Sequence, residues 1–487
     1  MAKKTSGRSV LTATESTSPS DHDWYRSRSY AHFDRPLSRA RAENLVTTPE
    51  KVARHSFWPL ILNPKRVVSL RSNVTGSRQR HIKLRPIAFA AHSDSHIFSY
   101  YARILTSRLE EEYEGIGETF ALAYRRFAPP RCNLHFAQSA FEEISREAPK
   151  DVIAIDVEAF FDSIDHSLLK TAWRKLLGVD RLPSDHFAVL HACTRDYAID
   201  LPRLREALGG EVRRRAGKGG YPICDPAKFR ENVVPRIQPR HQLVQLLKKK
   251  EIDDGDPHLG IPQGLPISAV LANLYMLDAD KILVSKISAL GGTYRRYSDD
   301  ILVIIDPDHS RQAEEFVYKE LGKVHLSANK KKTRRHRFSV LENRLCCRAL
   351  DEERNEHSES AVSYLGLTFD GSRTAIRDST VSRFLKKAKS AIRNAERTAR
   401  RQGAERLKRR KLYTRLTTLG YGSAYGTMSS NNPRSADVPR PGFFKYVALA
   451  IRVTKSESIR KQQRQIKNQV FRWLSEADKR LAEHAPG

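Results

Sequence analysis

Two adjacent carboxylates, Asp299 and Asp300, lie between two segments that are typical of β-strands. The segment before them, 294–297, is aromatic and basic, and the segment after them, 301–305, is a continuous run of isoleucine, leucine and valine. A short β-branched run of this kind is typical of a strand that is buried on both faces. The two segments therefore predict a hairpin within a sheet, with the two aspartates at its turn. Because such a sequence also occurs by chance, the hairpin alone leaves a plain polar turn and a metal-binding pair both open.

A third carboxylate, Asp156, ends another short apolar segment, 151–155. A charged side chain at the end of a buried strand costs free energy unless it is paired or binds a metal ion. Asp162 and Asp165 follow closely, and we expect them to cap helices instead. Divalent cations that prefer oxygen ligands neutralise clustered carboxylates. The three aspartates therefore predict a site for two Mg²⁺ ions, with Mn²⁺ as the alternative.

The charge of the chain indicates what it binds. It has 86 Lys and Arg against 56 Asp and Glu, which gives a net charge of +30. Such an excess favours a polyanionic partner, usually nucleic acid, with an anionic membrane surface as the rival. No apolar run approaches the ~18 residues of a membrane span, and no apolar signal segment follows the N-terminus. The five cysteines have no Cys-x-x-Cys spacing, so we expect a cytoplasmic protein without a zinc site or disulfides.

Other segments suggest how a nucleotide would be held. Lys83 and Arg85 alternate with apolar residues, as on a half-buried strand with one basic face. Residues 260–268 form a loop rich in Gly and Pro, after which Ser268 is expected to cap a helix. Residues 120–126 have the pattern of a strand that ends in two arginines, and 362–369 predict a strand interrupted by a glycine.

Five motifs, taken in chain order, resemble the palm motifs of reverse transcriptases. They are Ile155-Asp156…Phe160-Phe161, Ile261-Pro262-Gln263-Gly264…Ser268, Tyr297-Ser298-Asp299-Asp300, Leu326…Asn329…Lys332-Thr333 and Tyr364-Leu365-Gly366. Each motif is weak alone, but five in this order are specific. The resemblance implies an α+β fold, the right-hand polymerase fold, with fingers, an antiparallel-sheet palm and an α-helical thumb.

The resemblance also implies roles for individual residues. Asp156, Asp299 and Asp300 would hold the metal ions with the Val157 carbonyl, and Lys332 would give a proton or a positive charge to the pyrophosphate. Phe161 would be the steric gate that excludes a 2′-hydroxyl. The nucleotide would also be contacted by Lys83, Arg85, Phe160, Gln263 and Gly264. The template and primer would be contacted by Tyr297, Leu365 and Gly366.

The same resemblance divides the chain. Residues 1–24 would be a flexible basic tail, and 25–150 an N-terminal segment with the fingers. Residues 151–375 would form the palm, with an insertion of loops at about 177–258. The basic helical pattern of 376–430 would be the thumb, and 431–487 a helical C-terminal extension.

The subgroup depends on smaller differences. Retron and group II intron enzymes commonly have Ala where this chain has Ser298, and neither a late Val-Thr-Gly motif nor a Cys/His endonuclease is visible. The segments 30–34, 85–87 and 123–125 and the basic helical C-terminus look more like the bacterial "unknown group" and abortive-infection reverse transcriptases. That resemblance implies a role in anti-phage defence. It implies dNTPs as substrates and a structured noncoding RNA and a DNA product as partners, and it leaves open whether the protein is a homo-oligomer. One alternative is a retron- or intron-type enzyme. Another is an RNA-binding protein with a vestigial polymerase site; the presence of Asp156, Asp299, Asp300 and Lys332 argues against this second alternative.

Overall fold

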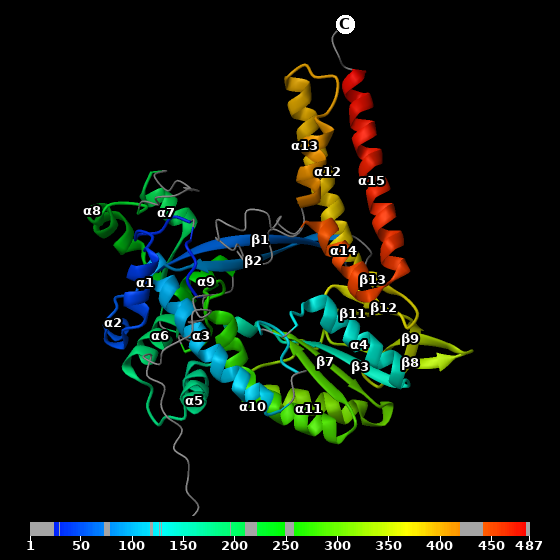
Figure 1. Ribbon diagram of the computed structural model, residues 1–487, viewed down its shortest axis with the longest axis horizontal. Helices are drawn as coiled ribbons and strands as arrows, with labels where there is room; N and C mark the ends of the chain where they lie inside the picture. Colours follow the sequence, from blue (N-terminus) through cyan, green and yellow to red (C-terminus); the bar gives the residue numbers. More distant parts are fainter. Residues whose placement is uncertain are drawn as a thin grey trace, which may run out of the picture.

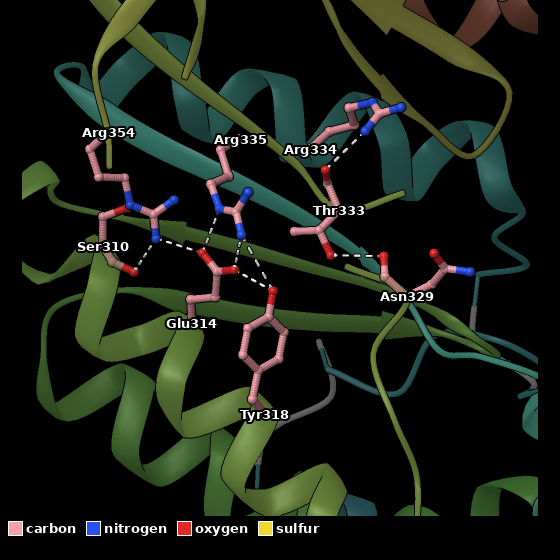
Figure 2. A network of polar contacts seen from close by, with 8 residues as sticks. All are labelled: Ser310, Glu314, Tyr318, Asn329, Thr333, Arg334, Arg335 and Arg354. Atoms are coloured by element: carbon pink, nitrogen blue, oxygen red, sulfur yellow. Dashed lines mark hydrogen bonds and ion pairs between the residues drawn. The ribbon is translucent and has the colours of Figure 1, made fainter. Parts of the chain in front are cut away.

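The structure is a computed structural model (Figure 1). It describes residues 24–28, 30–72, 78–116, 120–125, 127, 129–194, 196–209, 222–248, 258–418 and 442–483. The tail predicted for residues 1–24 lies outside this part of the chain, apart from Trp24. So do 210–221 and 249–257 of the predicted insertion, and 419–441 between the predicted thumb and extension.

An antiparallel sheet of six strands, in the order β10-β9-β8-β3-β7-β6, carries the predicted aspartate hairpin. Its strands are β3 (Lys150–Asp156), β6 (Thr293–Tyr297), β7 (Asp300–Ile305), β8 (Arg334–Leu341), β9 (Arg344–Leu350) and β10 (Glu356–Glu359). The hairpin is confirmed, because β6 and β7 pair directly. The end of β3 lies beside it, with Asp156 opposite Asp300 in the register.

Two hydrophobic cores cover the two faces of this sheet. Ile153 and Ile155 of β3 belong to one core with α10 (Ser268–Ala289) and α11 (Ser310–Lys323). The neighbouring Val152 belongs to the other core, with α4 (Asn133–Glu147). Alternate side chains of a strand point to opposite faces, so a central strand covered on both faces must be apolar throughout. This is why β3 and β7 appear in the sequence as continuous apolar runs.

A second sheet has the strand order β2-β1-β4-β5. In Figure 1, the long hairpin of β1 (Leu60–Ser72) and β2 (Arg78–Phe89) extends from the N-terminal body of the molecule towards the helices of the C-terminal part. Short strands β4 (Tyr197–Asp200) and β5 (Gln238–Pro239) continue the sheet. The helices of this part are α1 (Arg39–Val46), α2 (Pro49–Ala53), α3 (His92–Glu114), α5 (His166–Leu177), α6 (Ser184–Thr194), α7 (Leu201–Ala207), α8 (Pro226–Lys228) and α9 (Arg240–Lys248).

The segment that the sequence suggested as an insertion of loops, 177–258, is largely ordered structure where it is described. It contributes α6 to α9 and both short strands. Because β4 pairs in parallel with β1, the segment completes the sheet of the N-terminal part. A parallel partner that is over a hundred residues away leaves no local signal, which explains why the sequence indicated loops.

The C-terminal helices stand on a small third sheet. This sheet consists of β11 (Val362–Tyr364), β12 (Leu367–Phe369) and β13 (Thr374–Ile376). Figure 1 shows α12 (Asp378–Arg401), α13 (Arg409–Thr418) and α15 (Glu457–Ala482) as an upright helical arm, with α14 (Phe443–Thr454) near its base. Arg480 of α15 donates to Glu396 of α12 at 2.9 and 3.0 Å. The predicted thumb and the predicted extension thus pack together.

Three local expectations need correction. Ser268 does not cap α10; it is the first residue of the helix, and its hydroxyl donates to the carbonyl oxygen of Pro262. Asp165 does cap α5, by accepting from the amides of Ser167 and Leu168, whereas Asp162 is itself the last residue of a 3₁₀ turn, Phe160–Asp162. Within 120–126, the described residues form one isolated bridge, Ala121 with Arg296, rather than a strand.

The N-terminal segment packs on the body of the protein. The Tyr30 hydroxyl donates to the carbonyl oxygen of Ala90 at 2.8 Å, and the Asp34 carboxylate accepts from the amides of His92 and Ser93 at the start of α3. These contacts favour a structural role for the aromatic and basic residues of this segment. No helix in the described ranges is both long and apolar enough to cross a membrane.

Candidate active site

The three predicted aspartates meet where β3 ends and the β6–β7 hairpin turns. Asp156 and Asp300 are partners in the register of β3 and β7. The amide of Val157 donates to the carbonyl oxygen of Asp299 at 3.0 Å, which joins the two segments beyond the paired strands. Ser298, at the turn, has a positive φ of 61°, a conformation in which few non-glycine residues are found. The sheet therefore places three carboxylates in one small region.

Their proximity changes the acidity of the hairpin aspartates. Burial, and to a smaller extent the neighbouring Asp156 charge, raise the pKa of Asp299 above its ordinary value, although a backbone hydrogen bond to the carboxylate acts in the opposite direction. Asp300 keeps solvent-accessible surface, but burial, followed by the charges of Asp299 and Asp156, raises its pKa to about 6. Both shifts mean that the protein leaves the carboxylate form short of water and of positive charge.

Positive side chains reach the site from three other segments. Lys332, from the connection between α11 and β8, donates to the Asp156 carboxylate. Arg85 of β2 lowers the pKa of Asp299, and Arg377, just before α12, lowers that of Asp300. In both cases this effect is smaller than that of burial, so the pKa values of Asp299 and Asp300 stay above their ordinary value.

The donor set fits a divalent cation that prefers oxygen ligands. Although the three aspartates are neighbours, no group of three or more His, Cys, Asp or Glu side chains within the described ranges is placed to hold a metal ion in this arrangement. Lys332 pairs with Asp156 instead. Metal binding by Asp156, Asp299, Asp300 and the Val157 carbonyl therefore stays a prediction.

A buried ion pair lies beneath the aspartate turn. Arg296 of β6 and Asp280 of α10 form a bidentate pair in which the side chains are 1% and 0% exposed. Arg296 also donates to the carbonyl oxygen of Ser298 at 3.2 Å and to the side chain of Asn273 at 3.3 Å. The pair thus ties the turn to α10. This ion pair was not predicted from the sequence, although an arginine inside a strand next to a buried run indicates that a buried acidic partner is needed.

The two neighbouring phenylalanines of the first motif differ in burial. Phe160 is 3% exposed and belongs to the core, so its ring is occupied by packing. Its contact with the nucleotide stays a prediction. Phe161 is partly buried and follows it in a 3₁₀ turn. Of the two, only Phe161 has surface left for a sugar.

The loop with Gln263 and Gly264 lies beside the end of β2, the strand that carries Lys83 and Arg85. The amide of Ala88 donates to the carbonyl oxygen of Gln263 at 2.7 Å. Gly264 has a φ of +115°, and a Cβ there would lie 2.6 Å from the carbonyl oxygen of Ala88, so only glycine allows this approach. Lys83 and Arg85, both exposed, alternate along β2 and share one face. The Arg85 charge lowers the pKa of Asp299, so Arg85 is near enough to the aspartate hairpin to act on it.

The predicted template and primer residues are more widely spread. Leu365 and Gly366 form the turn between β11 and β12, and both have positive φ, as in a tight hairpin. Asn133 donates to the carbonyl oxygen of Leu365 at 2.8 Å. Tyr297, before the aspartate turn, is partly buried and lies against Phe136. Their contacts with nucleic acid stay predictions.

Tyr124 is a residue at the site that sequence reasoning did not assign. Its hydroxyl lies 3.4 Å from that of Ser298, and 46% of the residue is exposed. Its φ of 64° is a strained conformation for a bulky residue. The segment was expected to be a strand, and nothing in the sequence signals a left-handed residue there.

The comparison with known families decides the class of this domain. Residues 234–369 match the family described as Reverse transcriptase (RNA-dependent DNA polymerase). This part of the chain is therefore similar to a reverse transcriptase domain. The description of that family names RNA-dependent DNA polymerase activity, and the right-hand polymerase fold predicted from the sequence is confirmed. No curated protein sequence matches the chain.

The reverse transcriptase match covers less than a third of the chain. It includes the loop with Gln263, the aspartate hairpin, Lys332 and the turn with Gly366. It does not include β2 or β3, so Asp156, Phe161, Lys83 and Arg85 enter the site through the geometry alone.

Solved structures of telomerases show weak similarity to the chain. An apo telomerase from Candida tropicalis, truncated from its C-terminal domain, has a TM-score of 0.36 and 10% identity, covering 70% of this chain and 61% of that one. A telomerase from Candida albicans, in complex with a TWJ fragment of telomeric RNA, has a TM-score of 0.37 and 10% identity, covering 92% and 67%. The chain thus spans about three fifths of the length of the first of these.

Proposed function

We propose that the whole chain copies an RNA template into DNA, with Asp156, Asp299 and Asp300 holding two divalent cations. The observation that carries the proposal is the pairing of Asp156 with Asp300, which brings a carboxylate from outside the matched reverse transcriptase domain to the aspartate hairpin. When bound, such cations activate a 3′-hydroxyl and stabilise the leaving pyrophosphate.

The side chains around the carboxylates supply binding and orientation, which is most of what phosphoryl transfer requires from a protein. Lys83 and Arg85, on one face of β2, would bind the triphosphate of a dNTP. Lys332 now holds the Asp156 carboxylate; on metal binding its ammonium group would be released to donate to the pyrophosphate.

The direct test uses the purified full chain with a primed RNA template, dNTPs and Mg²⁺. We expect incorporation of deoxynucleotides directed by the template sequence, with a DNA template of the same sequence as a comparison. Folded protein that binds RNA but incorporates no nucleotide with Mg²⁺ or Mn²⁺ would contradict the proposal and support a vestigial site.

Phe161 should select the sugar. Of the two neighbouring phenylalanines, only Phe161 has free surface, so Phe161→Val should make room for a 2′-hydroxyl. Incorporation of rNTP relative to dNTP should rise on the order of tenfold or more, as expected for the loss of a pocket contact. The measurement is the ratio of kcat/KM for rNTP and dNTP. Phe187→Val, at an exposed position on α6, is the control; an unchanged ratio in Phe161→Val would contradict the gate.

RNA affinity should fall steeply with salt. The helical arm carries exposed basic side chains along α12, among them Lys386, Arg393 and Arg397. If six or more phosphates are neutralised, the affinity should drop on the order of 10³-fold between ~50 and ~200 mM salt. Replacing these three residues with Gln should lower the slope of log K against log salt by about 0.7 to 0.9 for each lost contact. A flat response, or a slope equal to that of the control Lys175→Gln, would place the RNA elsewhere.

The division into domains is part of the proposal. We group 25–150 with 177–258 as the N-terminal segment and fingers, supported by the β1–β4 pairing; α4, near the end of 25–150, packs on the palm sheet. We take the remainder of 151–375 as the palm. Residues 376–430 and 431–487 together form the thumb and its extension, supported by the ion pair between α12 and α15.

We also propose that the enzyme acts in the cytoplasm in anti-phage defence with a structured noncoding RNA. The support is the resemblance of the segments 30–34, 85–87 and 123–125 to defence-associated reverse transcriptases. The test is to isolate the protein from its native host and sequence the bound RNA and DNA. A noncoding RNA from the neighbouring locus is the expected result, whereas a branched RNA–DNA molecule would favour the retron type.

A further inference from the structure

Residues 260–264 connect two parts of the candidate active site through main-chain hydrogen bonds. The amide of Ile261 donates to the carbonyl oxygen of Phe161 at 2.8 Å. Two residues later, the Gln263 carbonyl oxygen accepts from Ala88 of β2 at 2.7 Å. The position of this loop therefore sets both the turn that carries Phe161 and the strand that carries Arg85.

The loop is fixed where it begins, at Gly260. This residue has a φ of +84°, and a Cβ there would lie 2.9 Å from the carbonyl oxygen of Asp162. Its amide donates to the carbonyl oxygen of Ile164 at 2.7 Å. Its own carbonyl oxygen accepts from Arg240 Nη2 and from His166 Nε2, each at 2.8 Å. A carbonyl can only accept, so Nε2 is the protonated nitrogen of His166.

Arg240 is itself held in place by Asp196. Its Nε donates to Asp196 Oδ1 at 2.9 Å, and its amide donates to the Asp196 carbonyl oxygen at 3.1 Å. The two side chains are 7% and 5% exposed. A buried ion pair often gives no more stability than apolar packing would, so stability alone does not account for an arginine at this position. The guanidinium supplies donors in two directions, one to Asp196 and one to Gly260, which no apolar side chain does.

We propose that Arg240, oriented by Asp196, is a positioning residue that sets the register of residues 260–264 and thereby the fit of the nucleotide between Phe161 and β2. The inference rests on the proposed polymerase function. Arg240 touches no substrate; it acts through the Gly260 carbonyl oxygen.

The structural part of the proposal is tested by hydrogen exchange, which needs no activity. Arg240→Met should speed amide exchange at Ile261 and Ala88 at least tenfold. Arg240→Lys should give an intermediate rate, because lysine keeps the positive charge but lacks the planar guanidinium that donates in two directions. Arg337→Met is the matched control. Arg337, in β8, also forms a bidentate pair with a buried aspartate, Asp151 of β3, at 2.8 and 3.1 Å. Equal acceleration in the control would show general destabilisation and overturn the proposal.

The double variant Arg240→Met/Asp196→Leu removes both charges and keeps the test valid if Arg240→Met does not fold. Exchange at Ile261 should again be faster than in the wild type, because the Gly260 carbonyl oxygen has lost its guanidinium donor. Wild-type exchange in the double variant would mean that His166 alone fixes the loop, which overturns the role of Arg240.

The functional part is tested by steady-state kinetics of the same variants. Arg240→Met, or the double variant, should raise KM for dNTP about tenfold and lower the discrimination against rNTP several-fold, while RNA affinity stays within twofold. Arg240→Lys should recover part of both effects. A fall in kcat alone, or faster exchange without a change in KM or discrimination, would overturn the positioning role. A wild-type chain without polymerase activity would instead refute the proposed function, and the exchange result would still stand.

Discussion

Replacing Asp299 and Asp300 together with Asn should lower dNTP incorporation by on the order of 10³-fold or more. Cation-held charge stabilisation contributes several kcal/mol to a transition state, and each ~1.4 kcal/mol corresponds to a factor of ten in rate. The measurement is single-turnover extension of a primed RNA template at saturating dNTP and Mg²⁺. Asn keeps the size of the side chain, so the loss reports on charge rather than on packing.

The same variant should fold as well as the wild type. Burial and the neighbouring charges raise the pKa of Asp299 and bring that of Asp300 to about 6. A carboxyl group whose folded pKa is raised opposes folding as the pH rises: the effect begins above the unfolded pKa and is fully present above the folded pKa, because the unfolded state ionises first. Removing both groups should therefore leave the melting temperature near neutral pH unchanged or higher, and RNA affinity intact.

Asp308→Asn is the matched control for the aspartate pair. It removes an exposed carboxylate just beyond the far end of β7, in a 3₁₀ turn, and should leave the extension rate unchanged. Activity that survives in the double Asn variant would contradict the proposed site. An equal loss in Asp308→Asn would point to a general effect of charge on RNA binding.

Replacing Arg296 with Met should be strongly destabilising. It leaves the Asp280 carboxylate buried without its partner, which costs about 3–5 kcal/mol, a large part of the ~5–15 kcal/mol that keeps a domain folded. Tyr294 would still donate to Asp280 at 2.8 Å, but one neutral donor does not replace a bidentate guanidinium. The free energy of unfolding from denaturant titration, followed by intrinsic fluorescence, is the measurement.

The double variant Arg296→Met/Asp280→Leu separates the ion pair from the turn it supports. With both charges removed, most of the stability should return, because apolar side chains of similar volume replace buried ion pairs with little loss. Polymerase activity should nevertheless stay low, since the donor to the Ser298 carbonyl oxygen is lost and the aspartate turn is no longer tied to α10. Full activity in this double variant would show that the turn holds its shape without Arg296.

Much of the candidate site was predictable because its residues lie at the ends of buried strands. The strands that carry Asp156 and Asp300 are short, apolar and covered on both faces, so their pattern and their charged ends are visible in the sequence. Residues in turns were harder. Phe160 and Phe161 are indistinguishable by composition, and only the 3₁₀ turn places one in the core and leaves the other partly exposed.

The sequence by itself determined the order of the motifs, the paired strands of the palm and the aspartates that they carry, because these depend on local periodicity and on the cost of burying charge. Only the tertiary structure decided which distant segments complete the site. It joined β4 to β1, placed Asp280 beneath Arg296 and brought Arg240 to the Gly260 carbonyl oxygen. Each of these contacts links residues that are far apart or on separate elements, and their partners are chosen by packing, which leaves no local pattern.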